Sequence, residues 1–504
     1  MKYRLLACLS LLLTGVLSAQ NFNDALRYSF VSPQGSARFA GTGGSLTPMG
    51  VDVTTLHTNP AGIGWNRFNL VQITPGFGLT NTDAQLEGDV FGNSLSESAA
   101  SFNIAGAGAV FAGTTRSVNF STLNFGISVA RMVDFNQQVR FGGATEGSLI
   151  EKFAVDASAA GQSGVNLYAE ALALPFLIRE DGAYYSDFYD FDANNGQGGQ
   201  RGGEIRREGL YDRRGGVTEV ALGFGGSYRE KLLWGLSIGI PFFRYEEATT
   251  YDEVDDQDFI PVFEDLNFNT NQTASGTGFN VKAGIIYLPT DELRISAGIH
   301  TPTFYSIDYN YSSSFSYFYT ELDTARGGTE LSPLNALTFN LRTPFRFNLG
   351  LGYLIGSKGF ISIDADYTDY TSNNISFDDF ATEAEVANAD IDAFLGSSIG
   401  VRVGGEANFK PFQVRAGVGY RQVPYSEFFR DEDESLLTYS AGVGYSVGKF
   451  YVDLTGQYEG YSAFQDIYRT NVEGFSDFSQ TALTDRSRIS VLLTVGFRGW
   501  NAGF

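Results

Sequence analysis

Residues 36–65 of the chain read SARFAGTGGSLTPMGVDVTTLHTNPAGIGW, and this stretch decides how the rest is interpreted. It is rich in glycine, has no strong period, and lies between an apolar N-terminus and a long series of alternating segments. Glycine adopts backbone conformations that are closed to other residues, and Pro60 restricts Asn59 to an extended conformation. The stretch therefore predicts a small irregular unit that ends in a fixed turn, Asn59-Pro60-Ala61-Gly62, leading into the first strand.

The composition favours many short strands joined by tight turns. The 504 residues include 60 Gly, 43 Phe and 27 Tyr, and only 18% of them are charged. This balance fits neither a disordered chain nor a helical bundle. Beyond the N-terminus the sequence has no apolar run long enough for a membrane-spanning helix. A membrane β-barrel carries its apolar face in alternating positions, so it shows no such run.

The N-terminus predicts export. Residues 1–19 have two basic residues, an apolar run and Ser18-Ala19 before Gln20, which is the pattern of a secretory signal peptide. The only cysteine, Cys8, lies inside it, so the mature chain is expected to have no disulfide and no thiolate metal site. The net charge of -23 excludes nucleic acid as a partner, because phosphate binding needs a basic surface.

After Trp65 the hydrophobic period becomes two. Each later segment places apolar residues on one face and polar or small residues on the other, and Tyr and Phe bound the apolar sets as interfacial girdles would. Typical apolar sets are Trp234, Leu236, Ile238, Ile240 and Phe242; Phe345, Phe347, Leu349, Leu351 and Tyr353; and Ile489, Val491, Leu493, Val495 and Phe497.

The connections between these segments alternate between short and long. The short ones are 114–117, 229–231, 289–292, 356–359, 410–411 and 448–449. The long ones are 81–100, 144–215, 248–275, 316–336, 376–397, 425–435 and 464–484. Short periplasmic turns and long outer loops are the pattern of outer-membrane barrels.

The strands between these connections number about fourteen. We therefore predict an all-β fold, a fourteen-stranded antiparallel transmembrane β-barrel over residues 68–504, with both ends on the periplasmic side. The lumen of such a barrel is too wide for its own side chains to fill. Residues 20–67 are expected to close it as an N-terminal plug, or hatch.

Two irregularities stand out against this pattern. The alternation of the third strand fails between Arg131 and Asn136, which predicts a bulge or kink. Residues 165–178 have apolar residues at helical spacing inside the longest connection, 144–215, and predict a helix there. A shorter helix is expected around 24–28, before Pro33.

Three features resemble a catalytic, a calcium-binding and a haem-binding site, but each matches its pattern poorly. Residues 396–400 match G-x-S-x-G, but a strand follows where a nucleophile elbow needs a helix. Asp190, Asp192 and Asn194 begin like a calcium loop whose later positions do not fit. His300 is expected to face the lumen, where a single histidine is more often a hydrogen-bonded wall residue than a haem ligand. We predict no catalytic residue, no metal and no cofactor.

The first stretch resembles the hatch of the FadL/TodX family of outer-membrane transporters for hydrophobic compounds. The resemblance rests on Ala37, Arg38, Gly41, Gly43, Gly44, Asp52 and above all Asn59-Pro60-Ala61-Gly62. It implies passive uptake of hydrophobic molecules, such as long-chain fatty acids or hydrocarbons, across the bacterial outer membrane. In the family, outer loops capture the ligand, and hatch movement and a lateral opening at the kinked third strand release it.

The resemblance assigns three groups of residues here. The hatch residues are Gly43, Gly44, Asn59, Pro60, Ala61 and Gly62. The candidates for an apolar capture groove are Leu167, Ala171, Leu174, Phe176, Leu177, Phe304 and Tyr305. The candidates for the kink at a lateral opening are Arg131, Asp134, Phe135 and Asn136.

One feature departs from the expected apolar conduit. The inward positions carry many charges, namely Lys282, Arg294, Arg346, Asp364, Asp366, Arg402, Glu406, Arg415, Asp453 and Glu459. They do not make a dry apolar conduit and would suit a lateral exit. A different class of function also stays open, a FadL-like barrel that binds protein in secretion or surface assembly, as PorV does, with the bulky connection 144–215 as its contact.

The expected partners follow from these interpretations. They are hydrophobic small molecules, outer-membrane lipid and lipopolysaccharide, and the barrel-assembly machinery during biogenesis. The protein is expected to act as a monomer and not as an enzyme; an outer-membrane lipid hydrolase is disfavoured because no serine and histidine occur together in a suitable context.

Overall fold

A computed structural model describes residues 22–89, 92–160, 166, 169–191, 199–200, 203–260, 262–321, 324–378, 381–426, 435–468 and 479–500. The predicted signal peptide with Cys8 lies outside these residues. So do Leu167 and most of the proposed calcium loop.

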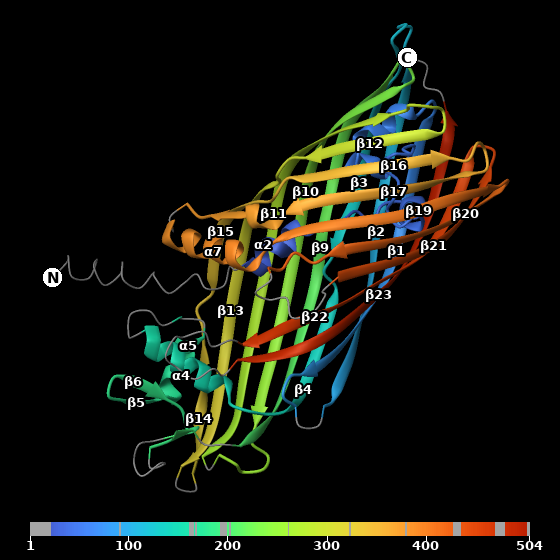
Figure 1. The fold of residues 1–504 in the computed structure, drawn as a ribbon. Helices are drawn as coiled ribbons and strands as arrows, with labels where there is room; N and C mark the ends of the chain where they lie inside the picture. The colour runs from blue at the N-terminus through green and yellow to red at the C-terminus, as the bar shows by residue number, and fades with distance from the viewer. Residues whose placement is uncertain are drawn as a thin grey trace.

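The described chain forms a closed antiparallel β-barrel (Figure 1). Its wall strands are β1 (Asn69–Leu86), β2 (Ser94–Thr114), β3 (Phe120–Asp134), β4 (Gln137–Glu146), β9 (Glu204–Tyr228), β10 (Leu232–Val254), β11 (Phe263–Tyr287), β12 (Leu293–His300), β13 (Phe304–Glu321), β15 (Asn335–Arg342), β16 (Arg346–Leu354), β17 (Gly359–Asp369), β19 (Ser397–Phe409), β20 (Phe412–Gln422), β21 (Ser435–Val447), β22 (Phe450–Tyr468) and β23 (Gln480–Trp500). These seventeen segments make fourteen wall strands. Three of the wall strands are each interrupted once and so consist of two segments in line, namely β3 with β4, β12 with β13, and β15 with β16. The barrel closes where β1 pairs with β23. The predicted strand number is confirmed.

Interruptions in the wall coincide with proline or with the predicted kink. The break between β12 and β13 contains Pro302, and the break between β15 and β16 contains Pro344. Proline has no N–H to donate to a neighbouring strand, so it is placed where the ladder can be broken. The break between β3 and β4 falls at Phe135 and Asn136, after a register shift between Arg131 and Val133. The predicted irregularity is therefore confirmed.

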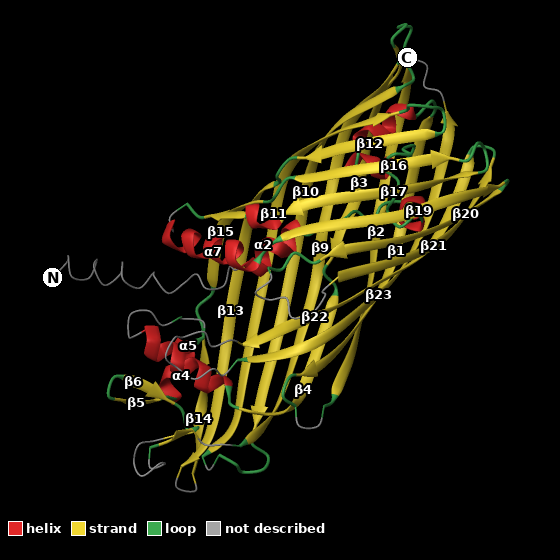
Figure 2. Ribbon diagram, viewed as in Figure 1, coloured by secondary structure: helices red, strands yellow, loops and turns green. Residues whose placement is uncertain are grey.

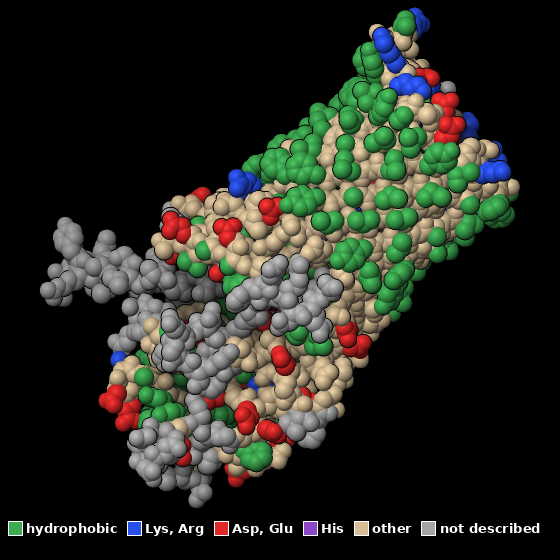
Figure 3. All heavy atoms as spheres, in the orientation of Figure 1, with side chains coloured by type: hydrophobic (Ala, Val, Ile, Leu, Met, Phe, Trp, Pro, Cys, Tyr) green, Lys and Arg blue, Asp and Glu red, His purple; other side chains and the backbone are tan. Residues whose placement is uncertain are grey.

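An apolar belt surrounds the half of the barrel that has the short turns. On β10, Leu236, Ile238, Ile240 and Phe242 point outward and are exposed, while the residues between them are buried. Leu349 on β16 is 63% exposed. Figure 3 shows hydrophobic side chains covering the surface around β12, β16 and β17, with acidic side chains mostly beyond them toward the long-loop end. Such a belt would be an aggregation hazard in water, so this part of the wall faces lipid.

Several predicted loops are strands that project beyond the belt. Residues 248–254 and 263–275 are the outer ends of β10 and β11, and residues 204–215 belong to β9. The expected boundaries of the long connections were wrong here. Outside the lipid the outward residues of a strand face water, so the apolar alternation that marks a membrane strand disappears although the backbone stays paired.

The smaller elements lie inside the barrel or at its long-loop end (Figure 2). The hatch contains α2 (Phe22–Ser29), α3 (Ala37–Gly41) and the 3-10 helices η1 (Val53–His57) and η2 (Pro60–Trp65). The long-loop end contains α4 (Leu149–Ala160), α5 (Glu170–Ala173), η3 (Leu174–Phe176), β5 (Ile178–Glu180), β6 (Ala183–Tyr185), β7 (Tyr189–Asp190), β8 (Gly199–Gln200), β14 (Thr324–Leu331), η4 (Tyr370–Ser372), β18 (Asn374–Ser376) and α7 (Ala381–Phe394). None of the described helices is long and apolar enough to cross a membrane.

The helix expected over 165–178 is much shorter in the structure. Of the residues described in this range, 166 and 169–178, those from Glu170 to Ala173 are α-helical, and Leu174–Phe176 continues as a single 3-10 turn before β5. Pro175 explains the early end, because proline lacks the N–H that the next helical turn needs. The predicted helix at 24–28 is confirmed as α2.

Candidate functional site

The hatch is seated in notches of the barrel wall. Asn59 caps η2 by accepting a hydrogen bond from Ala61 N (3.1 Å), and its amide nitrogen donates to the carbonyls of Ile285 (3.4 Å) and Ala297 (3.3 Å). The wall makes room for this turn with glycine. A Cβ at Gly284 would overlap the Asn59 amide, and a Cβ at Gly235 would overlap the backbone of Pro60.

A buried ionic cluster joins the hatch to strands β9 and β11. Glu219 accepts hydrogen bonds from His57 Nδ1 (2.8 Å), Lys282 Nζ (2.7 Å) and Asn280 Nδ2 (2.9 Å). The side chains of His57, Glu219 and Lys282 are at most 3% exposed. A buried carboxylate is tolerated only when it is paired and hydrogen-bonded, and here three donors satisfy it. The cluster therefore fastens the hatch to the wall.

Ser128, His57 and Glu219 are hydrogen-bonded in the same sequence as the serine, histidine and acid of a serine hydrolase triad. His57 Nε2 lies 3.1 Å from the Ser128 hydroxyl, while its Nδ1 donates to Glu219. However, Ser128 is 1% exposed and lines neither the cavity of about 1180 Å³ nor the small cavity beside His57 and Glu219. A nucleophile needs room for a substrate carbonyl and donors for the oxyanion. The sealed surroundings of Ser128 supply no such room, so the arrangement acts as a structural anchor.

Other inward charges also hold the hatch. Arg294 donates to Met49 O (2.8 Å), Arg346 donates to Val31 O (2.8 Å), and Asp364 accepts from Thr47 N (3.1 Å). Further inward ion pairs are Arg38 with Glu406 (3.0 Å), Arg415 with Glu406 (2.7 Å), Arg415 with Asp453 (2.6 Å) and Arg402 with Asp366 (2.6 Å). His300, which was expected to face the lumen, donates to Thr58 O (2.5 Å). Much of the predicted inner charge therefore lies between hatch and wall.

The wall is incomplete beside the kink. Strands β2 and β3 pair from Thr114 and Thr122 as far as Gly106 and Ala130, and there the pairing stops. From Ile104 to Ser94, β2 pairs only with β1. Strand β4 instead crosses the inner face of this part of the wall, because Val139 and Phe141 pack in one cluster with Ala84 and Leu86 of β1.

The predicted kink residues lie together at this break. Asp134 ends β3, and Phe135 and Asn136 connect it to β4. One Asp134 carboxylate oxygen accepts from Arg488 (2.8 Å), Ser101 (2.8 Å) and Asn103 (3.0 Å). The other accepts from the backbone and side chain of Asn136. Outward neighbours Phe102, 75% exposed, and Ile104 belong to the apolar belt, so the break is at membrane level.

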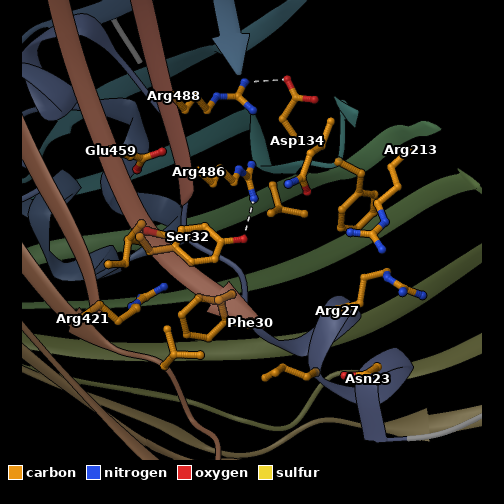
Figure 4. A pocket seen from close by; sticks show the side chains of 18 of the residues that line it. Asn23, Arg27, Phe30, Ser32, Asp134, Arg213, Arg421, Glu459, Arg486 and Arg488 are labelled. Carbon is orange, nitrogen blue, oxygen red and sulfur yellow. Dashed lines mark hydrogen bonds and ion pairs between the residues drawn. The ribbon is translucent and has the colours of Figure 1, made fainter. Parts of the chain in front are cut away.

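A cavity of about 1180 Å³ lies between the hatch, the kink and β19–β23 (Figure 4). Its lining is mixed: apolar side chains include Phe22, Leu26, Phe30, Phe135, Phe394 and Tyr425. Charged side chains lie among them, namely Asp24, Arg27, Arg213, Glu247, Asp366, Arg402, Arg421, Glu459, Arg486 and Arg488. Helix α2 reaches into this space, where Phe22 packs on Phe394 of α7 at 4.9 Å and Arg421 lies over the Phe30 ring at 5.0 Å. The cavity lining is therefore amphipathic and not uniformly apolar.

The residues expected to form a capture groove are not brought together. Phe176 packs against Phe315 (6.0 Å) and Tyr317 (5.6 Å) in the loop core, and Leu177 packs against the same core. Ala171 and Leu174 are half-buried in the same loop. Phe304 points outward, 54% exposed, whereas Tyr305 points inward and packs on Phe243 (5.6 Å). Neighbours on a strand point to opposite faces, so these two rings cannot line one groove.

The hatch glycines take up conformations that require glycine. Gly43 and Gly44 have φ of 65° and 78° directly after α3. They line the floor of the large cavity. Among the described residues no group of three or more His, Cys, Asp or Glu is arranged to hold a metal ion. The G-x-S-x-G segment at 396–400 continues directly into β19, so it does not form the strand-turn-helix of a nucleophile elbow.

A structure of a Pseudomonas aeruginosa FadL homologue has the same architecture. At 12% sequence identity it aligns with a TM-score of 0.51 over 92% of this chain and 98% of its own. This chain has the fold of a FadL homologue. The similarity noted at residues 36–62 is thus confirmed at the level of the fold.

Two further structures are similar at 12% identity. The Ralstonia pickettii toluene transporter TbuX gives a TM-score of 0.49 over 92% of this chain and 98% of its own, and the Pseudomonas putida toluene transporter TodX gives 0.46 over 92% and 97%. No model of a known protein family matches the sequence, and no curated protein matches it.

Sequence reasoning missed the partners of the kink and of the hatch. It placed Arg131–Asn136 correctly but did not find Ser101, Asn103 or Arg488. Arg488 comes beside the kink only once the first and last strands pair and close the barrel. It also missed His57 and Glu219, although a charged residue at an inward strand position is a signal that a buried partner is needed.

Proposed function

We propose that this protein is an outer-membrane channel for the passive entry of hydrophobic and amphipathic molecules, which leave the lumen sideways at the break between β2 and β3–β4. The observation that carries this proposal is the break itself. It combines a membrane-level interruption of the wall with an adjoining cavity of about 1180 Å³ that is lined by both apolar and charged side chains. The FadL-type fold supports the proposal by analogy only.

The lateral route fits the seating of the hatch. A path beneath the hatch would require Asn59 and Pro60 to leave their notches at Gly284 and Gly235 and would expose the Glu219 cluster. Separating buried charges from their partners is costly. Movement at the kink disturbs fewer such contacts, so in this proposal the hatch stays in place while the ligand exits toward the membrane.

The outer end of the lumen suits entry from the cell surface. The short turns and both barrel ends lie on one side, which we assign to the periplasm, and the projecting strands lie on the other. The cavity reaches Glu87, Asp466 and Thr481 near the long-loop end. Apolar molecules are held back by the polar lipopolysaccharide layer, and a lumen leading from the loops to the membrane interior bypasses this barrier.

A decisive test combines ligand identification with uptake. The protein is purified from its own outer membrane and studied by native mass spectrometry and lipid extraction, and uptake of a labelled long-chain fatty acid and of toluene is compared between cells with and without it. We expect a bound apolar or amphipathic molecule, and faster uptake in the cells that contain the protein. A barrel that is empty of such molecules and has no effect on uptake would refute the proposal.

A protein-binding role is the second candidate, favoured by the folded loop at the outer end. Leu149, Ile150 and Phe153 of α4 and Leu172 of α5 share a core with Phe315 and Tyr317 of the projecting β13. These contacts fasten α4 and α5 to the projecting strand, where they present a folded surface at the outer end. The same purification separates the two candidates, because a secretion or assembly component would carry a stoichiometric protein partner.

A further inference from the structure

The break in the wall is closed in this structure by polar side chains. Asp134 is fully enclosed, with its side chain 1% exposed, and Arg488 is 6% exposed. Three donors from two strands meet at one Asp134 oxygen, namely Arg488 of β23 and Ser101 and Asn103 of β2. These bonds tie the kink to the inner face of β2 at the level where backbone pairing has ended.

Arg488 reaches Asp134 across the inner face of β1, and Gly78 makes this possible. Gly78 pairs with Ser101 of β2 on one side and with Ser490 of β23 on the other. A Cβ at Gly78 would be 2.6 Å from an Arg488 terminal nitrogen and 2.9 Å from the Ser101 hydroxyl. Any side chain here would displace the guanidinium, so the path of Arg488 depends on glycine at this position.

Arg488 also faces the cavity. Figure 4 shows Arg488 and Arg486 on one wall of this space, with Asp134 joined to Arg488. Arg486 donates to the Tyr461 hydroxyl (2.9 Å), and among the residues that the structure describes it has no carboxylate within ion-pair distance. A negatively charged group in the cavity would therefore meet two guanidinium groups, and one of them, Arg488, donates within the described chain only to Asp134 and to the neutral hydroxyls of Ser101 and Ser490.

The geometry points to Asp134 and Arg488 as a gate: their ion pair keeps the lateral break closed, and an acidic group on the ligand opens it by replacing Asp134 on Arg488. This inference rests on the proposed lateral exit and names what controls it. A ligand shifts a conformational equilibrium only if it interacts differently with the two states. An anion binds Arg488 once Asp134 has released it, whereas a neutral hydrocarbon gains nothing from that release.

The gate can be tested without measuring transport. The mature chain is predicted to have no cysteine, so one introduced thiol reports a single position. Met132 lines the cavity behind the break and is buried, whereas Phe102 points outward into the belt. The protein with Met132→Cys is reconstituted in vesicles that contain a phospholipid with a maleimide at the end of its acyl chain. This reagent cannot leave the membrane, so it reaches position 132 only through the break.

The gate predicts slow labelling of Met132→Cys, and labelling about tenfold or more faster when Asp134→Asn or Arg488→Gln removes the charge-assisted bond. Gly78→Val should act in the same direction while keeping both charges. The matched control is Asp453→Asn, which breaks a similar inward pair with Arg415 (2.6 Å) away from the break and should leave labelling slow. Phe102→Cys should react rapidly in every background.

The trigger is tested by adding dodecanoate or dodecanol to the same vesicles. Dodecanoate should accelerate labelling of Met132→Cys severalfold, dodecanol should not, and Arg488→Gln should abolish the difference. Unchanged labelling in Asp134→Asn, Arg488→Gln and Gly78→Val, with Phe102→Cys still reactive, would overturn the gate. Failure of the uptake assay together with gated labelling would instead refute the channel and leave the gate standing.

Discussion

The side-chain amide of Asn59 occupies the space that any side chain at Gly284 would need. The two residues belong to opposite sides of the hatch-to-wall contact: Asn59 lies in the turn before η2, and Gly284 lies near the C-terminal end of β11. The carbonyl neighbours of this notch, Ile285 and Ala297, accept hydrogen bonds from the same amide. The inner face of the wall is therefore complementary to the hatch, and the hatch packs against it as part of the barrel interior.

The first prediction concerns this notch. Gly284→Ala should destabilise the protein by about 1–3 kcal/mol, because the new methyl overlaps the Asn59 amide and the packed surroundings cannot yield. The matched control is Gly456→Ala in β22, where a Cβ would have no neighbour within 4 Å. Melting of the barrel in detergent and protease access to the hatch measure the effect. Equal stability of the two variants would show that the hatch is not held by this notch.

The fold was largely predictable from the sequence, and the reason is the membrane. In the belt, lipid on one side and a filled lumen on the other force a strict alternation, which is visible from Phe345 to Tyr353 and from Ile489 to Phe497. Beyond the belt both faces are polar in part, so the outer ends of β9, β10 and β11 were mistaken for loops. The number of strands was still predicted correctly, because the short turns between paired strands remain recognisable in the sequence.

The candidate site was predictable only where it breaks the pattern. Arg131–Asn136 interrupts an alternating strand, and this alone located the kink. Its partner on β23, Arg488, follows from barrel closure, which joins residues 354 positions apart along the chain and leaves no local signal. Its partners on β2, Ser101 and Asn103, depend on how the kink lies against the inner face of that strand. The proposed groove failed for a local reason, since Phe304 and Tyr305 are adjacent on one strand and so face opposite sides.

The second prediction concerns the triad-like order of Ser128, His57 and Glu219. We expect no reaction of Ser128 with a fluorophosphonate probe in the folded protein, because the hydroxyl is buried and lines neither the large cavity nor the small one beside His57. Ser128→Ala should instead lower the free energy of unfolding by about 1 kcal/mol through the lost hydrogen bond. Mass spectrometry of the probe-treated protein provides the measurement, with a known serine hydrolase as the positive control. A Ser128 adduct would show that the hatch opens this site.

The third prediction concerns the buried ionic cluster. Lys282→Met should reduce stability by about 3–5 kcal/mol, because it removes one partner of a buried pair and leaves the Glu219 carboxylate less well compensated. The control is Arg206→Gln, which breaks an ion pair with Asp256 (3.1 Å) whose side chains are about half exposed. Exposed pairs contribute about 0–1 kcal/mol. Denaturant unfolding in detergent compares the two, and similar losses in both would contradict the anchoring role of the cluster.

The last prediction concerns pH at the outer end, where α4 packs on the projecting strands. Burial raises the pKa of the Glu151 carboxyl from 4.5 to about 8, and the nearby Glu253 carboxylate adds to the shift. The folded form thus favours protonated Glu151. Its contribution to the packing of α4 is fully present below the unfolded pKa and is lost as the pH rises through about 8.

Alkaline conditions should therefore loosen the segment 147–203 in the wild-type protein, and Glu151→Gln should keep it packed, because the amide stays neutral at every pH. Protease cleavage of this segment below and above pH 8, expressed as the ratio between the wild type and Glu151→Gln, cancels the pH dependence of the protease itself. Glu146→Gln serves as the control, since Glu146 is exposed at the end of β4 and no such burial acts on it. If the ratio between wild type and Glu151→Gln stays constant across pH 8, the Glu151 carboxyl does not govern the packing of α4.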